Sequence, residues 1–321
     1  MAANVHGFKQ DILLTNYARM LAPQREAFIA ERVFPVTDVP TKSGKFLDVQ
    51  RGFAAASPGH GMYRADGQRE YLSIPVKISQ VTGWEVEDGG LSTNVDRSSA
   101  KYAEGNGLDL RRAQAAVLDR ECRIIRERVA AGVAFNTTTF SGQTSALSGT
   151  DQWSDLSNSD PISNAQDAIS TILSASGEMP DTLIVGYDVH KSLIQNEKIV
   201  SAVKYTRPGF VGLLSNEIIA QALGVQNYIV GASVGNTAEF GQTETNAYIW
   251  GKFALFCKLR PSPQPMTPGS CLQRWRLMGS TDGAVSSWLP SPNVEQLQMS
   301  WCDQFAAPTT ALGYLYSTVV A

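Results

Sequence analysis

The chain has 321 residues, of which 43% are hydrophobic, and a formal net charge of −3 at pH 7. This length and apolar content predict a globular protein with one large or two ordinary domains. The net charge argues against nucleic-acid affinity arising from bulk charge, although local arginine clusters could still contact phosphate. The N-terminus lacks the basic start and apolar run of a signal peptide, and no apolar stretch is long enough to span a bilayer, so we expect a cytosolic product that enters no membrane.

The first part of the chain has the pattern of an extended arm. Residues 1–28 are polar and mixed, with one short amphipathic segment that Pro23 interrupts. Pro35 and Pro40 then favour extended backbone, and Ser43-Gly44 predicts a turn before a strand. Such an arm cannot bury its own apolar side chains, so we expect it to lie against other subunits or against another part of its own chain.

Two alternating segments, 46–51 and 71–82, predict a long hairpin. The apolar face of the second segment comprises Leu72, Ile74, Val76 and Ile78. Pro75 within this strand is typical of an edge strand, so we expect the hairpin to lean on something outside its own domain. Residues 83–107 are acidic and rich in glycine, and they predict a connector that ends where a helix starts.

Residues 108–135 carry a long helical pattern, with two apolar rows on one half of the helix and a polar seam between them. The rows are Leu110, Val117, Ile124 and Ala131, and Leu118, Cys122, Ile125 and Val129, while the seam is Gln114, Glu121 and Arg128. A polar seam within an apolar arc predicts that each row packs against a different body, one of which could be a neighbouring subunit. The opposite face carries Arg112, Asp119, Arg123 and Arg126. The i,i+4 pairs of Asp119 with Arg123 and of Arg123 with Glu127 predict a solvated or interfacial surface.

The C-terminal half alternates helices and strands, which predicts an α+β or α/β fold. Asp160 before Pro161 predicts the N-cap and first residue of a helix that ends at Gly177 and turns Leu173 inward. Strands are predicted at 182–185, 228–230, 248–250 and 253–259, with helices near 189–194 and 215–223. Two further strands, from 294 and from 311, are predicted to return to the main body.

Residues that could carry chemistry are sparse. His190 is the sole candidate general base, and Asp188 two residues earlier is explained as the N-cap of a short helix. The four cysteines are scattered and predict small buried side chains: Cys122, Cys257, Cys271 and Cys302. We therefore expect no catalytic, cofactor-binding or metal-binding residues, and we expect that the protein is not an enzyme.

Taken in order, these features resemble the tailed-bacteriophage major capsid proteins with the Hong Kong ninety-seven phage capsid fold. The stretches that carry the resemblance are 28–35, 39–40, 43–46, 109–132, 152–154, 160–162, 180–186, 204–206 and 249–251. Unrelated proteins would not share the order and spacing of these stretches.

The resemblance implies an α+β fold whose parts are an N-terminal arm at 1–45, an extended E-loop at 46–85, a P-domain at 86–177 with a spine helix at 108–135, an A-domain at 178–290, and C-terminal strands at 291–321 that return to the P-domain. It implies a head protein that self-assembles into hexamers and pentamers, which form the icosahedral shell of the virion around double-stranded DNA. The DNA would be held without sequence specificity. A separate scaffold protein, a portal and a decoration protein are the implied partners, and assembly would take place in the host cytoplasm.

The candidate subunit-interface residues are Phe28, Ile29, Val33, Phe34, Leu72, Ile74, Val76, Lys77, Arg112, Arg123 and Arg126. Among them, Lys77 is interpreted as an outward charge that protects a strand edge. Ile29, Val33 and Phe34 are expected to be buried against other subunits or against the subunit's own spine helix.

Two alternatives stay open. The same fold also builds bacterial encapsulin compartments, which hold enzymes instead of a genome. The third hypothesis is an α/β enzyme built on the strand-helix unit, which would leave the arm, the hairpin and the long helix unexplained.

Overall fold

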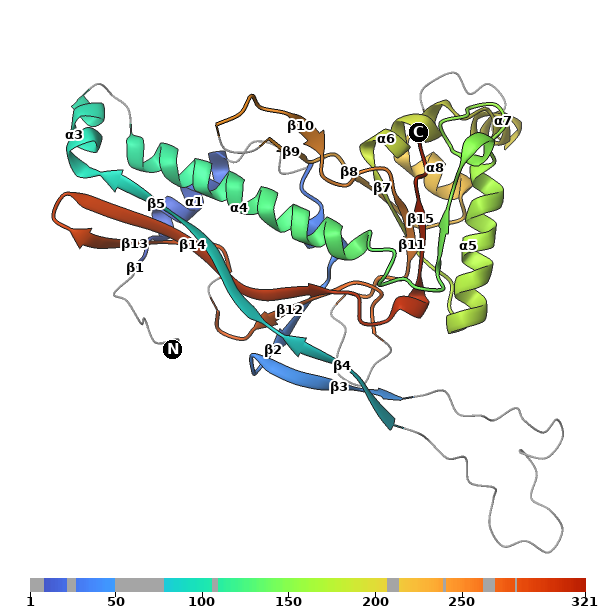
Figure 1. The fold of residues 1–321 in the computed structure, drawn as a ribbon, viewed down its shortest axis with the longest axis horizontal. Coiled ribbons are helices and arrows are strands. Elements are labelled where there is room, and N and C mark those ends of the chain that lie inside the picture. The colour runs from blue at the N-terminus through green and yellow to red at the C-terminus, as the bar shows by residue number, and fades with distance from the viewer. Residues whose placement is uncertain are drawn as a thin grey trace, which may run out of the picture.

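The computed structural model describes residues 9–21, 27–49, 78–105, 109–206, 214–238, 241–261, 269–280 and 282–321. The predicted α+β class is confirmed, because two mixed sheets are joined by one long helix, α4 (Leu110–Ala134), which reaches from one sheet to the other (Figure 1). Among the helices described, none has the length and apolar content needed to cross a bilayer.

The first sheet has six strands and is organised around β14 (Val294–Ala306). One edge of β14 pairs with β13 (Ala284–Ser291) and then with β12 (Gln273–Leu277), while its other edge pairs with β5 (Glu87–Asp96). The outer strands are β1 (Lys9–Gln10), which pairs with β13, and β2 (Val36–Val39), which runs parallel to β12. This sheet therefore joins the N-terminal arm, the strand before α4 and the C-terminal part of the chain.

The sequence prediction of a connector at 83–107 is wrong, because this stretch forms β5 and α3 (Arg97–Gly105). One of the glycines that predicted a loop, Gly90, instead allows β5 to approach its neighbour closely. A side chain at Gly90 would clash with the carbonyl of Met299 on β14. Glycine in a strand commonly marks such a close approach of two backbones.

The second sheet has the strand order β6, β15, β11, β7 and β8. Its strands are β6 (Thr144–Ala146), β7 (Thr182–Gly186), β8 (Asn227–Gly231), β11 (Ala254–Cys257) and β15 (Gly313–Ser317). The helices beside it are α5 (Pro161–Ser176), α6 (Tyr187–Gln195), α7 (Glu197–Thr206) and α8 (Asn216–Ala222) (Figure 1). Leu183, Val185 and Phe256 from the sheet and Ile172 from α5 are among the buried residues of this core.

The remaining elements are smaller. They are α1 (Ile12–Leu21), α2 (Ala30–Val33), the hairpin of β3 (Ser43–Val49) and β4 (Ile78–Glu85), the hairpin of β9 (Val234–Asn236) and β10 (Asn246–Tyr248), and 3-10 turns at Gly149–Asp151 and Thr310–Leu312. The predicted pairing of the segments that begin at 46 and end at 82 is confirmed for the described part, where β3 and β4 run antiparallel. Residues 50–77, which include the hairpin tip, lie outside the described residues.

Several local predictions in the C-terminal half are confirmed. Asp160 caps α5 by accepting a hydrogen bond from the Ser163 N–H at 3.1 Å, and Gly177 ends the helix in the left-handed conformation at φ 70°. Leu173, predicted to face inward, is exposed instead. The strand predicted at 248–250 ends at Tyr248, because residues 249–251 form a turn.

The two sheets divide the chain differently from the expected domain boundaries in three places, because a local pattern does not encode which distant strand a strand pairs with. Residues 273–291 form β12 and β13 in the six-stranded sheet and do not belong with 178–272. β15 joins the second sheet, although both C-terminal strands were expected to return together. α5 packs into the core of the second sheet, although it was placed before the boundary at 178.

The predicted spine helix is confirmed as α4, and Asp109 caps it by accepting from the Arg112 N–H at 3.0 Å. Helix α4 does pack against two different parts of the structure, as predicted. Its N-terminal half contacts one part and its C-terminal half contacts the other, whereas the prediction assigned one part to each apolar row. Its N-terminal half buries Ala115, Leu118 and Cys122 against α1 and the six-stranded sheet. Its C-terminal half buries Ala130, Ala131 and Ala134 against the arm and the second sheet. Val117, Ile125 and Val129, which were predicted to be buried, are exposed by 60%, 43% and 50%.

This division can be tested with two substitutions on α4. Leu118→Ala should lower the free energy of unfolding by about 2–5 kcal/mol, because it leaves a cavity among buried side chains. Ile125→Ala should cost about 1 kcal/mol or less, because much of that side chain is already in water. Urea unfolding measures both values, and equal losses would contradict the packing described.

Candidate assembly surfaces

The carboxylate of Glu127 joins three segments of the chain. It accepts hydrogen bonds from the Ala30 N–H of the arm at 2.7 Å and from the Trp250 indole N–H at 2.5 Å. The Ser233 hydroxyl lies 3.4 Å away and donates to the same carboxylate. Because Trp250 and Ser233 belong to the part of the chain that flanks the second sheet, Glu127 fixes the arm, α4 and that sheet to one another.

Burial raises the pKa of Glu127 above its ordinary value of 4.5, and the hydrogen bonds from Ala30 and Trp250 oppose that shift. The cost of removing the charged carboxylate from water is therefore only partly offset by its donors. The predicted i,i+4 pair of Arg123 with Glu127 is not formed among the salt bridges of the described residues, whereas the predicted pair of Arg123 with Asp119 is present at 2.8 Å.

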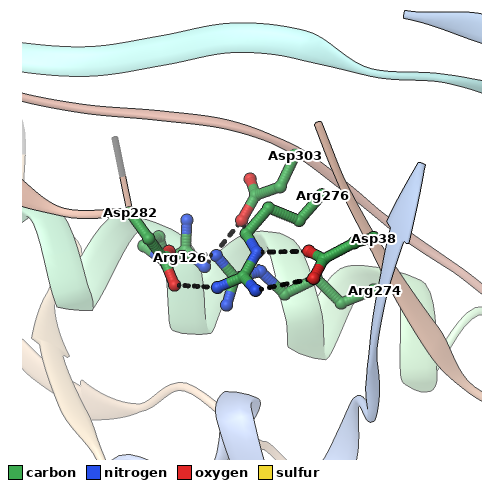
Figure 2. A network of polar contacts seen from close by, with 6 residues as sticks. All are labelled: Asp38, Arg126, Arg274, Arg276, Asp282 and Asp303. Carbon is green, nitrogen blue, oxygen red and sulfur yellow. Dashed lines mark hydrogen bonds and ion pairs between the residues drawn. The ribbon is translucent and has the colours of Figure 1, made fainter. Parts of the chain in front are cut away.

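Three arginines and three aspartates form a second connection, which Figure 2 shows: Asp38, Arg126, Arg274, Arg276, Asp282 and Asp303. Arg274 donates to Asp303 and to Asp282, each at 2.5 Å. Arg276 binds Asp38 in a bidentate manner at 2.7 and 3.1 Å. Arg276 also reaches Asp282 at 2.7 Å. The cluster thus joins β2 of the arm, β12 and the loop before β13.

The same cluster includes α4 and β14, because a nitrogen of the Arg126 guanidinium lies 2.8 Å from Asp303. Burial, and then repulsion by Arg274, lowers the pKa of Arg126. Its guanidinium also stacks 4.6 Å from the ring centroid of Trp301 and 5.2 Å from that of Phe305. Buried arginines of this kind are stable only while their carboxylate partners are present.

The base of the β3–β4 hairpin is held by several contacts of its own. Trp84 packs directly over Gly44, where any side chain would clash with the indole, and the indole N–H donates to the Thr41 carbonyl at 3.0 Å. Lys42 forms an ion pair with Asp88. Gly44 therefore lies within β3 and not in the predicted turn, and it is needed for the contact with Trp84.

A groove of about 520 Å³ lies between α4, β5 and β14. Its floor and walls are mainly apolar and include Leu91, Ile125, Val129, Trp301 and Phe305. Three exposed carboxylates lie on its rim: Glu85, Glu87 and Asp88. A large apolar groove with a charged rim on the described surface is typical of a site that binds a protein segment.

The structure separates the predicted interface residues into three groups. Ile29, Val33 and Phe34 are wholly buried within their own chain, against the C-terminal half of α4, so they are not free for a neighbouring subunit. Their expected burial against the subunit's own spine helix is confirmed. Leu72, Ile74, Val76 and Lys77 lie outside the described residues.

The remaining candidates differ in exposure. Arg112 is exposed and pairs with Asp109 at 2.8 Å, so it stays a candidate. Phe28 and Arg123 are half-buried and line a separate cavity of about 440 Å³. Arg126, predicted on a solvated face, is held inside the molecule by Asp303.

Sequence reasoning missed the groove and most of the residues that hold it in place. The charges at Arg274 and Arg276 alternate with Trp275, which is the pattern of a strand with one polar and one apolar face, but residues 260–291 were assigned no strand. Nothing in the sequence indicates that Glu127 is buried, because its hydrogen-bond partners Ala30 and Trp250 are remote in sequence. The prediction for Asp188 is also wrong, since Gly186 is the N-cap of α6 and Asp188 lies in its first turn.

His190 is part of a small aromatic cluster and shows no catalytic partner among the contacts described. Its Nδ1 lies 2.9 Å from the Tyr228 hydroxyl, and burial lowers its pKa. Cys122, Cys257, Cys271 and Cys302 are free and buried, as predicted. Among the described residues, no group of three or more histidine, cysteine or acidic side chains is placed to hold a metal ion.

The raised pKa of Glu127 predicts a specific pH dependence. An acid whose pKa is higher in the folded state contributes stability that is complete below its unfolded value of 4.5 and is lost as the pH rises through the folded value. The difference in unfolding free energy between the wild type and Glu127→Gln should therefore shift against the wild type as the pH rises above about 4.5. Urea titrations from pH 4 to 8 measure it, and a shift in the opposite direction would contradict the assignment.

The buried arginine cluster predicts a large effect of removing one carboxylate. Asp303→Ala should cost about 3–5 kcal/mol of unfolding free energy, because it leaves Arg274, which is only 3% exposed, and Arg126 without a shared partner. Lys42→Ala, which breaks an exposed ion pair, should cost about 1 kcal/mol or less. Similar losses for the two variants would show that the cluster is solvated.

Comparisons with known proteins show which sequences and structures this chain is similar to. No family model matches the chain. The chain is 26% identical to a major capsid protein of Pseudomonas phage JBD67 over 285 residues, which covers 85% of this chain and 84% of the relative. It is 22% identical to a major capsid protein of Burkholderia phage BcepMu over 232 residues, which covers 70% of this chain and 69% of the relative.

The fold is similar to that of a phage-related protein from Bordetella bronchiseptica RB50, with a TM-score of 0.70, 19% identity and coverage of 98% and 99% of the two chains. The capsid of Myoviridae phage XM1 matches with a TM-score of 0.52, 11% identity and coverage of 90% and 91%. A virus-like particle from Pyrococcus furiosus matches with a TM-score of 0.52, 11% identity and coverage of 95% and 98%. The sequence relatives and the fold together make this chain a phage capsid shell protein with the Hong Kong ninety-seven phage capsid fold.

Proposed function

We propose that copies of this chain assemble into hexamers and pentamers that close into an icosahedral shell around double-stranded phage DNA. In this proposal the six-stranded sheet with α4 is the P-domain, the second sheet with its helices is the A-domain, and the β3–β4 hairpin is the base of the E-loop. The role is mechanical. Symmetry makes the same surfaces meet many times, so modest contacts sum to a stable container.

The observation that carries the proposal is that, among the described strands, β3 and β4 pair only with each other. Their hairpin forms a two-stranded sheet of its own and extends away from both larger sheets (Figure 1). An isolated two-stranded hairpin is at best marginally stable in water. Its base is firmly fixed by Trp84 and Gly44, so the hairpin is well placed to find its missing support on a neighbouring subunit.

The groove between α4, β5 and β14 is the proposed seat for a neighbour's hairpin. Ile125 and Val129 expose apolar surface there, and the predicted apolar face of the hairpin matches it in chemistry. The rim carries exposed carboxylates, whereas residues 50–77 have four basic and two acidic side chains, namely Arg51, Arg64, Arg69 and Lys77 against Asp66 and Glu70. Complementary charge favours this pairing and its register.

The proposed capsid role also implies partners other than further copies of this chain. The proposed partners are a separate scaffold protein that sets the size of the shell, a portal through which DNA enters, and a decoration protein that binds the finished surface. DNA contact would be independent of sequence, which agrees with the net charge of −3. Assembly would take place in the host cytoplasm, and the product would be the capsid of the virion.

A second candidate is an encapsulin-like compartment. An encapsulin complex from Synechococcus elongatus PCC 7942, which matches with a TM-score of 0.50, 11% identity and coverage of 94% and 90%, favours it. Electron microscopy of particles purified from phage-producing cells, combined with nuclease treatment and analysis of their contents, separates the two. Packaged DNA supports the capsid, and a protein cargo without DNA supports the compartment.

If the groove binds a neighbour's hairpin, a charged side chain placed in it should prevent assembly. Ile125→Asp should fold normally, because the side chain is already 43% exposed, but it should form no regular particles, because a carboxylate would be buried under the neighbour's hairpin. Val117→Asp is the matched control, since Val117 is an exposed valine on the same helix that does not line the groove. Circular dichroism checks the fold, and analytical ultracentrifugation with electron microscopy checks assembly.

Normal shells from Ile125→Asp would contradict the proposed seat. A wild-type chain that stays monomeric at every salt and protein concentration would contradict assembly itself. The two results are distinct, because the first leaves the shell function intact.

A further inference from the structure

Two of the buried cysteines lie together where the chain passes from one sheet to the other. Cys257 is the last residue of β11 in the second sheet, and Cys271 lies two residues before β12 in the six-stranded sheet. Both side chains are wholly buried in the same apolar cluster. That cluster also holds the arm and the C-terminal half of α4, so the pair lies at the centre of the subunit.

The backbone brings the two residues side by side. The Cys271 N–H donates to the carbonyl of Lys258, the residue after Cys257, at 3.0 Å. Cys257 stands directly opposite Gly313 in the β11–β15 pair, so both residues direct their Cβ positions to the same face of the sheet. The Cys271 sulfur lies only 2.6 Å from the point that a Gly313 Cβ would occupy. The absent side chain of Gly313 thus provides the space in which the two thiols meet.

As a thiol, Cys257 ionises less readily than an ordinary cysteine. Burial, and then the hydrogen bond with the Cys271 thiol, raises the pKa of Cys257 well above its ordinary value. The other two cysteines lie elsewhere, Cys122 on α4 and Cys302 on β14 beside Asp88. The mechanical role of the subunit uses none of the four, which leaves the proximity of Cys257 and Cys271 without an assigned purpose.

We propose that Cys257 and Cys271 are a redox-active pair that forms an intramolecular disulfide when the protein meets a disulfide oxidant such as glutathione disulfide. When a local opening of the core exposes one cysteine, its thiolate attacks a sulfur of the oxidant, which forms a mixed disulfide and expels one glutathione thiolate. The thiolate of the second cysteine attacks the mixed disulfide and expels the second glutathione thiolate. The two cysteines lose two protons and two electrons, and the oxidant is reduced to two thiols.

The bridge would act as a lock between the two sheets. It would tie the end of β11 to the start of β12 and close the loop between them, which lowers the entropy of the unfolded chain. In the reducing cytoplasm the pair stays as two thiols, and in an oxidising medium outside the cell the bridge forms. The subunit would therefore be stiffer after release than during assembly.

The test uses the full-length wild-type chain, purified with reductant and then held without it. One sample is kept with glutathione disulfide at 37 °C for a day, and the other with dithiothreitol. Both are alkylated with N-ethylmaleimide after denaturation, digested and analysed by mass spectrometry. The oxidised sample should show two alkylated cysteines instead of four, and a linked peptide pair containing Cys257 and Cys271. Its melting temperature should rise by roughly 5 °C relative to the reduced sample.

Two single-cysteine substitutions show which residues form the disulfide. Cys271→Ala should abolish the linked peptide and the rise in melting temperature, while Cys122→Ala should retain both. The peptide result on the wild type decides the question even if a variant fails to fold. Four alkylated cysteines after oxidation, or a bridge that includes Cys122 or Cys302, would overturn the proposal.

Discussion

The buried carboxylate of Glu127 is the contact on which the subunit depends. A carboxylate removed from water costs several kcal/mol unless donors surround it. Here the donors are the Ala30 N–H of the arm and the indole of Trp250, which lies in the segment that leads to β11. Each donor is held in place only if its own segment is docked. The arm, α4 and the second sheet therefore reach their positions together, and none of them can be displaced without exposing or orphaning a polar group.

Small side chains make this junction possible. The C-terminal half of α4 buries Ala130, Ala131 and Ala134, whose methyl groups let the arm and the sheet come close to the helix axis. Larger side chains in this half would keep Ile29 and Phe34 at a distance, and Ala30 would then be out of reach of Glu127. The distance between packed elements is set by the side chains at their contact. Close packing and the polar contact are thus two aspects of one arrangement.

The sequence alone was sufficient to predict those features that depend only on residues close together in the chain. The N-cap at Asp160, the left-handed Gly177 and the extent of α4 were all predicted, because each follows from local periodicity or capping chemistry. Strand partners were not predicted, since β5 looked like a glycine-rich loop until β14 was placed beside it. The faces of α4 were assigned wrongly for a related reason. Ile125 has the character of a core residue, and in the proposed assembly a neighbour's hairpin would cover it.

The distribution of charge and apolar surface suits a rigid subunit that would assemble reversibly into the proposed shell. The cluster of three arginines and three aspartates is buried at Arg274, largely buried at Arg126 and Asp303 and partly exposed at Asp38, Arg276 and Asp282, and its charges sum to zero within the subunit. Strong contacts between subunits would trap misplaced copies during shell growth. The exposed groove lined by Ile125 and Val129 offers a weaker apolar contact, which can dissociate and form again. Repetition over a closed shell then supplies the stability that no single interface provides.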